Sequence, residues 1–583
     1  MGAMRMRLSR VMLSLIAGVA ASTQAATNIA AATGVQAEAT TAQAVAPDGH
    51  VDAAANAAGT LRYIHSAWGV LERRTTDCRA LIDTKIDMAD AEGPVLYVPH
   101  GMAIPAEAAA AAKRCHTRVL ELPRVIERIG DVHPEELTQE GLLYLPRPYI
   151  VPGERFNEMY GWDSYFILLG LLEDHQTELA RGVVENLVFE VEHYGGVLNA
   201  NRSYYLTRSQ PPFLAAMIRL IAADKACFHT GEGGERKRRQ WLERAYRAAA
   251  KDYTTWLRPE HRAGDTGLAR YYDYGSGPVP EMADASSYYR DVLRALVDHP
   301  QRGTQDFLVR GAEFPDAAEA AQLAGSSCDI HRSPVCARAW HKGYRLSRDF
   351  YAGDRAMRES GFDTSDRFGA FSGATHHYAP VCLNSLLYRY EQDMAQLAAE
   401  LGEVRDVTLW KRRAEARQQA INRYLWQPGE GYYADYDFVH AKPSEYAFLT
   451  AFDPLWAGAA SPQQAEAMRD KLPWFERSGG LMTSTRETGL QWDAPYGWAP
   501  LQWMTAAGLR AYGYDADARR IATRFNTTVD EVFAADGTIR EKYDVTSGSA
   551  KFTTSAGYTQ NVVGFGWTNG VYLKLHALIA GRE

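Results

Sequence analysis

The stretch that decides the fold class is Phe213-Leu-Ala-Ala-Met-Ile-Arg-Leu-Ile-Ala-Ala223. Its apolar residues recur at three and four positions, which is the period of a helix with one face in a core. The same spacing, with charges on the complementary face, recurs in further stretches: Tyr165–Leu172, Lys237–Leu257, Leu383–Leu401 and Leu409–Leu425. The sequence therefore predicts a mostly helical protein.

Long loops separate these predicted helices, and they are rich in Gly, Pro, Tyr and Trp. They hold nearly all of the unusual residue clusters: 151–163, 195–212, 270–289, 359–369, 432–437, 489–503 and 541–570. Many helices with function concentrated in long connections on one side favour an all-α toroid over stacked small domains. No signature recurs with a period of about 20 to 50 residues, so a repeat solenoid is disfavoured.

Composition sets the broad class. The chain has 583 residues, of which 46% are hydrophobic and 23% charged, so it can bury a large core as an ordinary globular protein. Length alone would suggest about two to four domains. The formal net charge is −8. Binding to nucleic acid needs a basic face, so a nucleic-acid partner is not expected.

The N-terminus has the layout of a secretory signal peptide. Arg5, Arg7 and Arg10 precede the apolar run Val11 to Ala21, and small residues follow it. This predicts a signal peptide over 1–25, a flexible Ala/Thr-rich leader over 26–60 and a single catalytic domain over 61–583. The apolar run is too short for a permanent membrane anchor. We therefore expect a periplasmic or secreted protein with no anchor after signal removal.

Six cysteines are few for this length, and an exported chain could pair some of them. Cys328 and Cys336 flank a short loop that contains Pro334, so this pair is predicted to form a local disulfide. No C-x-x-C spacing occurs, which makes a zinc site or a redox motif improbable.

One loop combines an acid with aromatic rings in the run Gln491-Trp-Asp-Ala-Pro-Tyr-Gly-Trp-Ala-Pro500. Aromatic faces stack on the apolar faces of sugars and carboxylates accept from hydroxyls, so the run indicates a carbohydrate pocket. A buried turn with a packed Trp492 explains the same residues. The loop before Tyr165 is similar, and there Asp163 is either a site carboxylate or a helix N-cap.

Two further loops carry site chemistry. The segment Asn199-Ala-Asn-Arg-Ser-Tyr-Tyr-Leu-Thr-Arg-Ser-Gln-Pro-Pro212 offers amides and guanidinium groups that match sugar hydroxyls. In Arg358-Glu-Ser-Gly-Phe-Asp-Thr-Ser-Asp-Arg-Phe368, the Asp363 carboxyl follows Phe362, whose ring excludes water. Partial desolvation predicts a raised pKa for Asp363 and hence a proton donor. Helix capping remains an alternative role for Asp363.

These segments together resemble the trehalases of glycoside hydrolase family 37, from roughly residue 75 to the C-terminus. The family signature P-G-G-R-F-x-E-x-Y-x-W-D-x-Y appears as Pro152 to Tyr165, with Glu154 in place of the second glycine, and Q-W-D-x-P-x-G-W-A-P is Gln491 to Pro500 without a mismatch. Further motifs match at 199–212, 359–365, 435–437, 541–544 and 564–570.

The resemblance implies an (α/α)6 barrel that hydrolyses α,α-trehalose with inversion at the anomeric carbon. Matched by motif, Asp363 is the general acid and Glu541 the general base, although Glu541 could instead form a surface salt bridge with Lys542. The implied substrate-binding residues are Arg155, Phe156, Tyr160, Trp162, Asp163, Asn199, Arg208, Gln210, Glu281, Gly361 and Trp492. No metal or organic cofactor is implied, the only partner is a small disaccharide, and we expect a monomer.

Several departures from the family pattern concern the substrate. An arginine usual near the sugar is replaced by Val279, and the family's glycine-rich lid with its glutamate is here Thr553-Thr-Ser-Ala-Gly-Tyr558. Phe362 and Phe368 stand where tryptophans are usual. Arg270 or Glu487 could supply the missing contacts. Two alternatives therefore stay open: an inverting α-glucosidase of the same family with another substrate, and a sugar-binding protein without catalysis.

Overall fold

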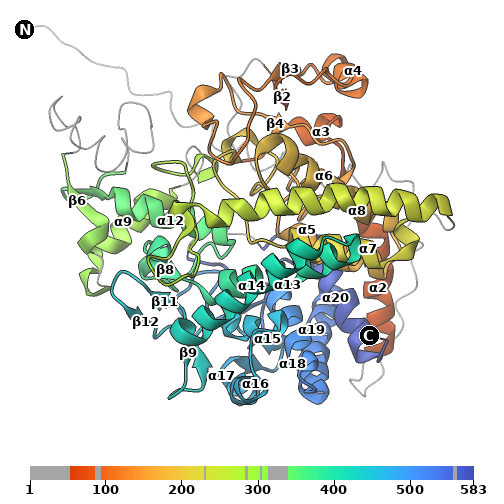
Figure 1. The fold of residues 1–583 in the computed structure, drawn as a ribbon. Coiled ribbons are helices and arrows are strands. Elements are labelled where there is room, and N and C mark those ends of the chain that lie inside the picture. The colour runs from red at the N-terminus through yellow and green to blue at the C-terminus, as the bar shows by residue number, and fades with distance from the viewer. Residues whose placement is uncertain are drawn as a thin grey trace, which may run out of the picture. The chain divides into compact units, whose positions relative to one another are not determined.

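A computed structural model describes residues 53–85, 93–228, 232–282, 287–302, 305–312, 339–555 and 561–582, which belong to one compact unit, Ala53–Glu583. Within these residues six helices, all labelled in Figure 1, form a closed ring by their contacts: each contacts the next, and the last contacts the first. They are α5 (Asp163–Glu173), α7 (Leu214–Ala223), α13 (Val381–Leu401), α15 (Asp453–Ala457), α18 (Ala499–Ala511) and α20 (Gly566–Ile579).

A second set of helices alternates with the ring along the chain. Its members are α2 (Ala53–Leu71), α6 (Thr177–Tyr194), α8 (Glu232–Tyr253), α14 (Val404–Ala420), α16 (Pro462–Arg469) and α19 (Asp515–Asp536). The ring helices are apolar on nearly all sides, as the almost complete burial of α5 shows, whereas α8 and α14 carry many charges. The architecture is an (α/α)6 barrel, which confirms the predicted fold class.

Glycines allow the closest helix contact in the ring, between α5 and α20. A Cβ atom added at Gly170 would lie 2.3 Å from the Cα of Gly570, and one added at Gly570 would lie 2.1 Å from the carbonyl oxygen of Phe166. Any side chain at either position would separate the helices, so the first and last helices of the ring depend on this pair.

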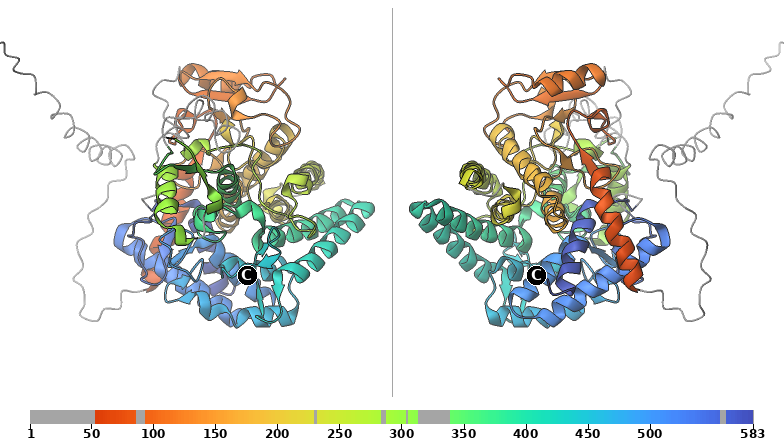
Figure 2. Two further views of the ribbon diagram at one scale, coloured as in Figure 1. Left: turned by 90° about the vertical axis from the view of Figure 1, so that its left-hand side faces the viewer. Right: turned by 90° about the vertical axis from the view of Figure 1, so that its right-hand side faces the viewer.

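Helix α2 begins at Ala53, so residues 53–60 are helical and do not belong to the predicted flexible leader. Alanine is the strongest helix former, and the Ala-rich composition that suggested a leader also suits a helix once Ile64 and Trp68 bury one face. This helix packs against α19 and α20, which places an N-terminal element beside the C-terminal ones (Figure 2).

A small parallel sheet was not predicted. Its order is β3-β2-β4, formed by Arg118–Glu121, Val95–Val98 and Leu142–Leu143, and α4 (Ala106–Arg114) connects β2 to β3. All four residues of β2 are buried, as in a strand covered on both faces. Beside it, α3 (Cys78–Leu81) is joined to the end of α4 by a Cys78–Cys115 disulfide. The predicted Cys328–Cys336 pair lies outside the described residues.

The remaining elements are short. They include helices α9 (Tyr288–Asp298), α12 (Arg348–Ser360) and α17 (Leu472–Phe475) and mostly antiparallel ribbons. The ribbon strands are β1 (Glu72–Arg73), β5 (Tyr149–Ile150), β6 (Leu308–Arg310), β7 (Tyr344–Leu346), β8 (Tyr378–Ala379), β9 (Trp426–Gln427), β10 (Tyr432–Tyr433), β11 (Tyr436–Asp437), β12 (Lys442–Pro443), β13 (Glu476–Arg477), β14 (Gly480–Leu481), β15 (Tyr496–Trp498) and β16 (Lys542–Asp544).

Two features of the packing bear on the site. The β15–β16 pair sets Trp498 opposite Lys542, which brings the 491–500 loop to the loop that carries Glu541. A separate hydrophobic cluster lies under α9 and α12 and includes Val279, Tyr289 and Phe350. Among the described residues no helix is both long and apolar enough to cross a membrane.

Candidate active site

The Asp363 carboxyl is positioned by the end of α12. Ser347 caps the start of this helix by accepting a hydrogen bond from the Phe350 amide at 3.1 Å. The helix ends at Gly361, which has a φ of 77°, and a Cβ atom there would lie 2.7 Å from the Trp162 indole. Only glycine fits this position, because the backbone is left-handed and the ring is in contact. Asp363 follows two residues later.

The Asp363 carboxyl lies in a partly desolvated environment. Burial raises its pKa to about 6, and Arg358, whose Nη1 lies 3.4 Å from Oδ2, opposes that rise. The direction agrees with the prediction from the Phe362 loop. The side chain still exposes 28% of its surface, so a substrate can reach it. Its backbone carbonyl accepts a hydrogen bond from Gln491, which ties the acid loop to the 491–500 loop.

Glu541 does form the salt bridge with Lys542, at 2.6 Å from Nζ to Oε2, but the pair is not on the surface. Lys542 is fully buried and Glu541 is 4% exposed. The Lys542 ammonium also lies 4.8 Å from the centre of the Trp498 ring. The Glu541 side chain is therefore held in place by a buried ion pair beside the aromatic rings.

Asp163 is the first residue of α5 and Trp162 occupies the N-cap position, so the simple capping interpretation does not hold. Burial raises the pKa of Asp163 well above its usual value, and the charges of Glu541 and Asp363 add to the rise. Asp163 therefore lies close enough to both predicted catalytic carboxyls for their charges to affect its pKa. A carboxyl with a raised pKa keeps its proton to a higher pH than a free aspartic acid does.

Aromatic rings form one wall of the site. Trp492 stacks on Trp498 with ring centres 3.8 Å apart, and it is 2% exposed, so packing is part of its role. Trp162 contacts Trp492, Phe362 and Trp567 at 5.4 to 5.9 Å. The Trp567 Nε1 donates to the Glu541 carbonyl at 3.4 Å. The rings thus connect the loop that carries Asp363 to the backbone at Glu541.

Polar side chains from the 199–212 loop form another wall. Arg208 binds Glu281, and its Nη2 also donates to Asn199 Oδ1 at 3.4 Å. Burial opposes the charged form of Glu281, but Arg208 and Arg358 outweigh it and lower its pKa. Gln210 accepts from the Trp162 amide at 2.9 Å, so it holds the backbone of the aromatic wall. The structure thus brings all four of these predicted residues together.

Arg155, Phe156 and Tyr160 follow one another on the loop before α5. The Arg155 guanidinium lies 4.9 Å from the Phe156 ring centre and lines a cavity of about 630 Å³ together with Arg540 and Asn561. Phe156 packs edge-on against Tyr160 at 5.7 Å. The predicted residues on this loop therefore cluster beside the loop that carries Glu541.

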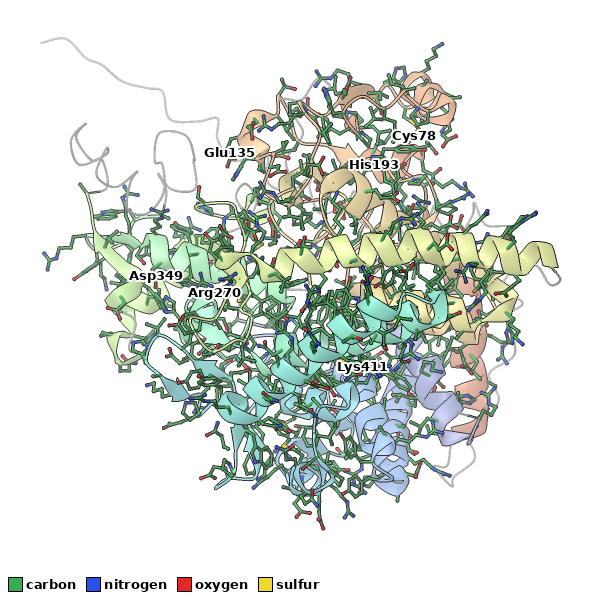
Figure 3. All side chains as sticks on the ribbon, in the orientation of Figure 1. Cys78, Glu135, His193, Arg270, Asp349 and Lys411 are labelled. Carbon is green, nitrogen blue, oxygen red and sulfur yellow. A yellow bond between two sulfur atoms is a disulfide. The ribbon has the colours of Figure 1, made fainter. Side chains whose placement is uncertain are left out.

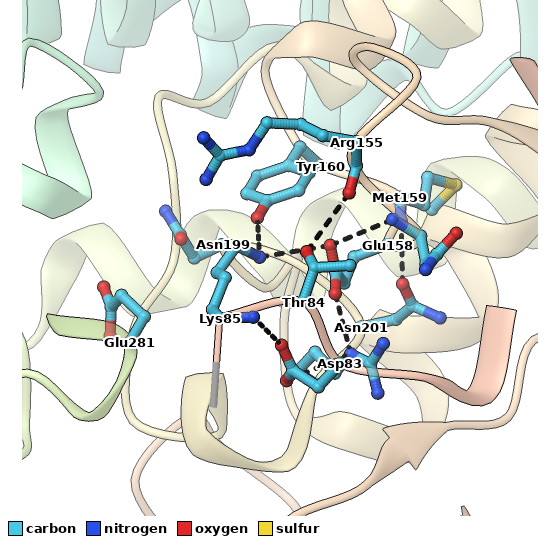
Figure 4. A network of polar contacts seen from close by, with 12 residues as sticks. Asp83, Thr84, Lys85, Arg155, Glu158, Met159, Tyr160, Asn199, Asn201 and Glu281 are labelled. Carbon is cyan, nitrogen blue, oxygen red and sulfur yellow. Dashed lines mark hydrogen bonds and ion pairs between the residues drawn. The ribbon is translucent and has the colours of Figure 1, made fainter. Parts of the chain in front are cut away.

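A buried ionic network that the sequence did not reveal supports this loop (Figure 4). The Lys85 ammonium donates to Glu158 at 3.1 Å and to the Tyr160 hydroxyl at 2.5 Å. Glu158 also accepts from Arg202 at 2.9 Å, and Arg202 lies 3.6 Å from Asp83. Two cations and two carboxylates balance in a space that excludes solvent, since the Lys85 side chain is only 5% exposed.

The residues that bear on the missing family contacts lie as follows. Val279 packs in the cluster under α9, and its amide donates to the Tyr289 hydroxyl at 2.8 Å. Arg270 donates to the carbonyls of Glu260 and His376, both at 2.8 Å. Glu487 is solvent-exposed. Of the altered lid segment, residues 553–555 are described, and the rest lies outside the described residues.

One cluster in the described part has the donor atoms of a metal site. Asp349, which is labelled in Figure 3, accepts from His376 at 2.9 Å and from His377 at 3.3 Å. The carboxylate is accounted for by these two histidines. The predicted site carboxylates Asp163, Asp363 and Glu541 are not part of this cluster.

The sequence analysis missed three residues whose side chains contact the site or the loop that supports it: Lys85, Glu158 and Arg358. Glu158 lies inside the 152–165 signature, so its place there was a usable signal. Lys85 is far from that signature in the chain, and Arg358 precedes the acid motif on a helix. Nothing in local spacing reports that these side chains turn into the site.

A carboxylic acid with a raised pKa, a second carboxylate and aromatic walls in the loops of an (α/α)6 barrel define a glycoside hydrolase. The Trehalase family model matches residues 70–309 and 342–579. The chain belongs to the trehalase family.

Similar proteins agree with this placement. A probable trehalase of Eremothecium gossypii is 34% identical over 87% of this chain and 71% of its own length. A cytosolic neutral trehalase of Saccharomyces cerevisiae is 35% identical over 84% of this chain and 67% of its own length. The structure of the neutral trehalase Nth1 from Saccharomyces cerevisiae superposes with a TM-score of 0.72, at 33% identity, and the match covers 90% of this chain and 94% of that one.

The predicted signal peptide and the predicted periplasmic or secreted location are wrong by this comparison. Several matched fungal relatives are named cytosolic neutral trehalases. The prediction rested on composition alone, and a few arginines before a short apolar run satisfy that pattern without specifying export. Residues 1–52 lie outside the described part of the chain.

Proposed function

We propose that this protein hydrolyses α,α-trehalose with inversion, using Asp363 as the general acid and Glu541 as the general base. The observation that carries the proposal is the contrast between the two carboxyls. Asp363 is half-enclosed with a pKa raised to about 6, whereas Glu541 is held against the Lys542 ammonium. A protonated donor and an ionised acceptor are the two states that an inverting glycosidase requires.

We propose that the glycosidic bond breaks and the bond to water forms in a single displacement at the anomeric carbon. Asp363 gives its proton to the glycosidic oxygen as the bond to the anomeric carbon breaks. Water attacks that carbon from the opposite face and gives a proton to Glu541. The products are one β-glucose and one α-glucose. Asp163, which is close enough for the charges of Asp363 and Glu541 to act on it, would bind a hydroxyl of the reacting sugar.

The rings around the site serve the same step. An oxocarbenium-like transition state develops positive charge at the anomeric carbon, and nearby carboxylates stabilise it more strongly where water is excluded. Trp162, Phe362 and Trp492 pack against one another next to the Asp363 loop, and we propose that they provide that exclusion. We expect the reaction to need neither a metal nor an organic cofactor.

Val279 favours a second candidate function, the hydrolysis of another α-glucoside. Its side chain is fully buried in a hydrophobic cluster, so it makes no polar contact with a leaving sugar. An inverting α-glucosidase with another leaving group would have the same acid and base. Kojibiose, nigerose and aryl α-glucosides therefore belong in the substrate test.

The experiment is a proton NMR time course of the purified protein with trehalose. The expected result is β-glucose appearing at once in equal amount with α-glucose, and no product from Asp363→Asn or Glu541→Gln. Asp265→Asn is the matched control, since Asp265 is solvent-exposed and should retain full activity. If trehalose persists while another α-glucoside is cleaved, trehalose is not the substrate. If sugars bind but none is cleaved, the proposal that the protein is a hydrolase is refuted.

A further inference from the structure

Three side chains from two separate elements converge on one point near the start of α12. Asp349 lies in the first turn of that helix, and His376 and His377 end the short 3₁₀ turn η10 (Thr375–His377). Asp349 Oδ1 lies 2.9 Å from His376 Nε2 and 3.3 Å from His377 Nε2. Consecutive side chains of a regular helix do not face each other, so the local fold turns both rings toward the same oxygen.

The exposure of the three side chains is that of a site which a small ion can enter. The His376 side chain is 9% exposed, His377 23% and Asp349 41%. Within the described part of the chain, Nδ1 of His376 is buried without a hydrogen-bond partner, so this ring directs its polar contact at Asp349. Buried polar rings are rarely so poorly paired, and a ligand bound more strongly than a hydrogen bond would account for this one.

The ring nitrogens can bind such a ligand without a change in net charge. A neutral imidazole carries one ring proton, and with that proton on Nδ1 the Nε2 lone pair is available to a metal ion. The Asp349 carboxylate accepts from the two rings, and an ion would take the place of the two ring protons between these atoms.

Close packing holds the two elements that carry these side chains. A Cβ atom added at Gly353 on α12 would lie 1.7 Å from the carbonyl oxygen of Gly373, so the helix meets the segment before η10 backbone to backbone. Arg270 donates through Nη1 to the His376 carbonyl at 2.8 Å and fixes the turn. Side chains on elements supported in this way need little rearrangement to bind an ion.

We propose that Asp349, His376 and His377 form a binding site for one Zn²⁺ ion, separate from the proposed catalytic carboxyls. Two imidazole nitrogens and a carboxylate oxygen are ligands that zinc takes, and water would complete the tetrahedron. Ligand atoms about 2.0–2.1 Å from a tetrahedral zinc ion lie about 3.3 Å apart, which fits the contacts of 2.9 and 3.3 Å. All three ligand atoms lie within 4.8 Å of one another, and rotation of the partly exposed His377 ring closes the remaining gap.

The ligand set also predicts which ions are rejected. Mg²⁺ and Ca²⁺ prefer sites made of oxygen atoms, whereas this site offers two nitrogens and one carboxylate. The positive charge of Arg270 acts on His376, so an ion held by charge alone is further disfavoured. Zinc should therefore stay bound in an excess of either ion.

The bound ion would join the two ends of the segment that carries the proposed acid. Asp349 lies at the start of α12, Asp363 follows the end of that helix, and His376 and His377 come after the acid loop. Ligands 27 residues apart meet only in the folded chain, so zinc would bind the folded state and stabilise it. The role is structural, and the proposed hydrolysis stays free of metal.

The test is zinc binding to the full chain, purified without a histidine tag and stripped with EDTA. Equilibrium dialysis against micromolar Zn²⁺, with millimolar Mg²⁺ and Ca²⁺ present, should leave one zinc ion per chain. His377→Ala should lower the affinity by about 100-fold or more, since loss of even an outer-shell partner costs up to that much. Asp349→Asn, which keeps the size of the side chain, should weaken binding as well.

Thermal denaturation supplies a second readout. Zinc at about 100 times its dissociation constant should raise the midpoint of wild type by about 3–5 °C and leave that of His377→Ala unchanged. Midpoints in EDTA check that each variant folds, and Asp349→Asn decides if His377→Ala does not. His440→Ala is the matched control, because His440 contacts Asp437 at 2.8 Å but belongs to no three-ligand group among the described residues. It should bind zinc as wild type does.

Three results would overturn the proposal. They are a wild type that holds no zinc after dialysis, zinc that is displaced by Mg²⁺ or Ca²⁺, and zinc bound equally by wild type, His377→Ala and Asp349→Asn. The last result would mean adventitious binding at other histidines. None of these measurements uses a sugar substrate, so the outcome is independent of the proposed function.

Discussion

Lys85→Met tests whether the buried ionic network supports the site from a distance. In the native protein Lys85 and Arg202 balance Glu158 and Asp83. The substitution removes one cation and keeps most of the volume of the side chain, which leaves one carboxylate charge in excess. Removing one partner of a buried pair costs about 3–5 kcal/mol, and Arg202 still binds Glu158, so we expect about 3 kcal/mol.

The assay has two parts. For a chain of this length a loss of 1 kcal/mol lowers the thermal midpoint by about 1–2 °C, so the expected fall is about 3–6 °C. The Tyr160 hydroxyl also loses its donor at 2.5 Å, and kcat/KM for the substrate should fall by about tenfold. Arg155 and Phe156 lie on the same loop as Tyr160. The fall in kcat/KM therefore reports how much the position of this loop depends on Lys85.

The double variant Lys85→Met with Glu158→Gln separates charge from packing. Removing the excess carboxylate charge should recover about 1–2 kcal/mol relative to the sum of the single variants. Burial raises the pKa of Glu158, but Lys85 and Arg202 outweigh burial and lower it to about 2. Such a depressed carboxyl stabilises the protein above its unfolded pKa. The difference between wild type and Lys85→Met is therefore largest above about pH 5 and disappears as pH falls toward 2.

A thermal midpoint within 1 °C of wild type would refute this reasoning, as would single-variant losses that add without coupling. Arg244→Met is the control. Arg244 forms a half-exposed pair with Glu192, and loss of such a pair costs about 0–1 kcal/mol.

Three other predictions follow from the site and its support. Gly361→Ala should destabilise the protein by about 2–3 kcal/mol and reduce kcat, because its Cβ would meet the Trp162 ring at a positive φ; thermal denaturation and steady-state kinetics test this, and a stable, fully active variant would contradict it. Activity should fall as pH rises through about 6, since Asp363 must be protonated to donate; a kcat/KM profile that stays flat to pH 8 would exclude Asp363 as the acid. Replacing Cys78 and Cys115 by serine opens a loop with a sequence separation of 37 and should cost about 4 kcal/mol, seen as a lower thermal midpoint, whereas an unchanged midpoint would show that the loop is held by packing alone.

The sequence by itself determined the fold class and the order of the motifs. Helical spacing in stretches such as Phe213–Ala223 depends only on which residues lie three and four apart, so it could be read directly. The raised pKa of Asp363 was also predictable, because the adjacent Phe362 ring excludes water from the carboxyl. What local pattern could not provide was the small parallel sheet around Val95–Val98, whose short apolar run fits a helix or a strand equally well.

The tertiary structure alone decided the electrostatic states of the site. Asp163 and Glu541 are far apart in the chain, and the charge of Glu541 acts on Asp163 only in the folded protein. The roles of Lys85 and Arg358 have the same origin, since each acts on residues contributed by other segments. Charge and burial depend on all neighbours in space, whereas spacing along the chain reports one element at a time.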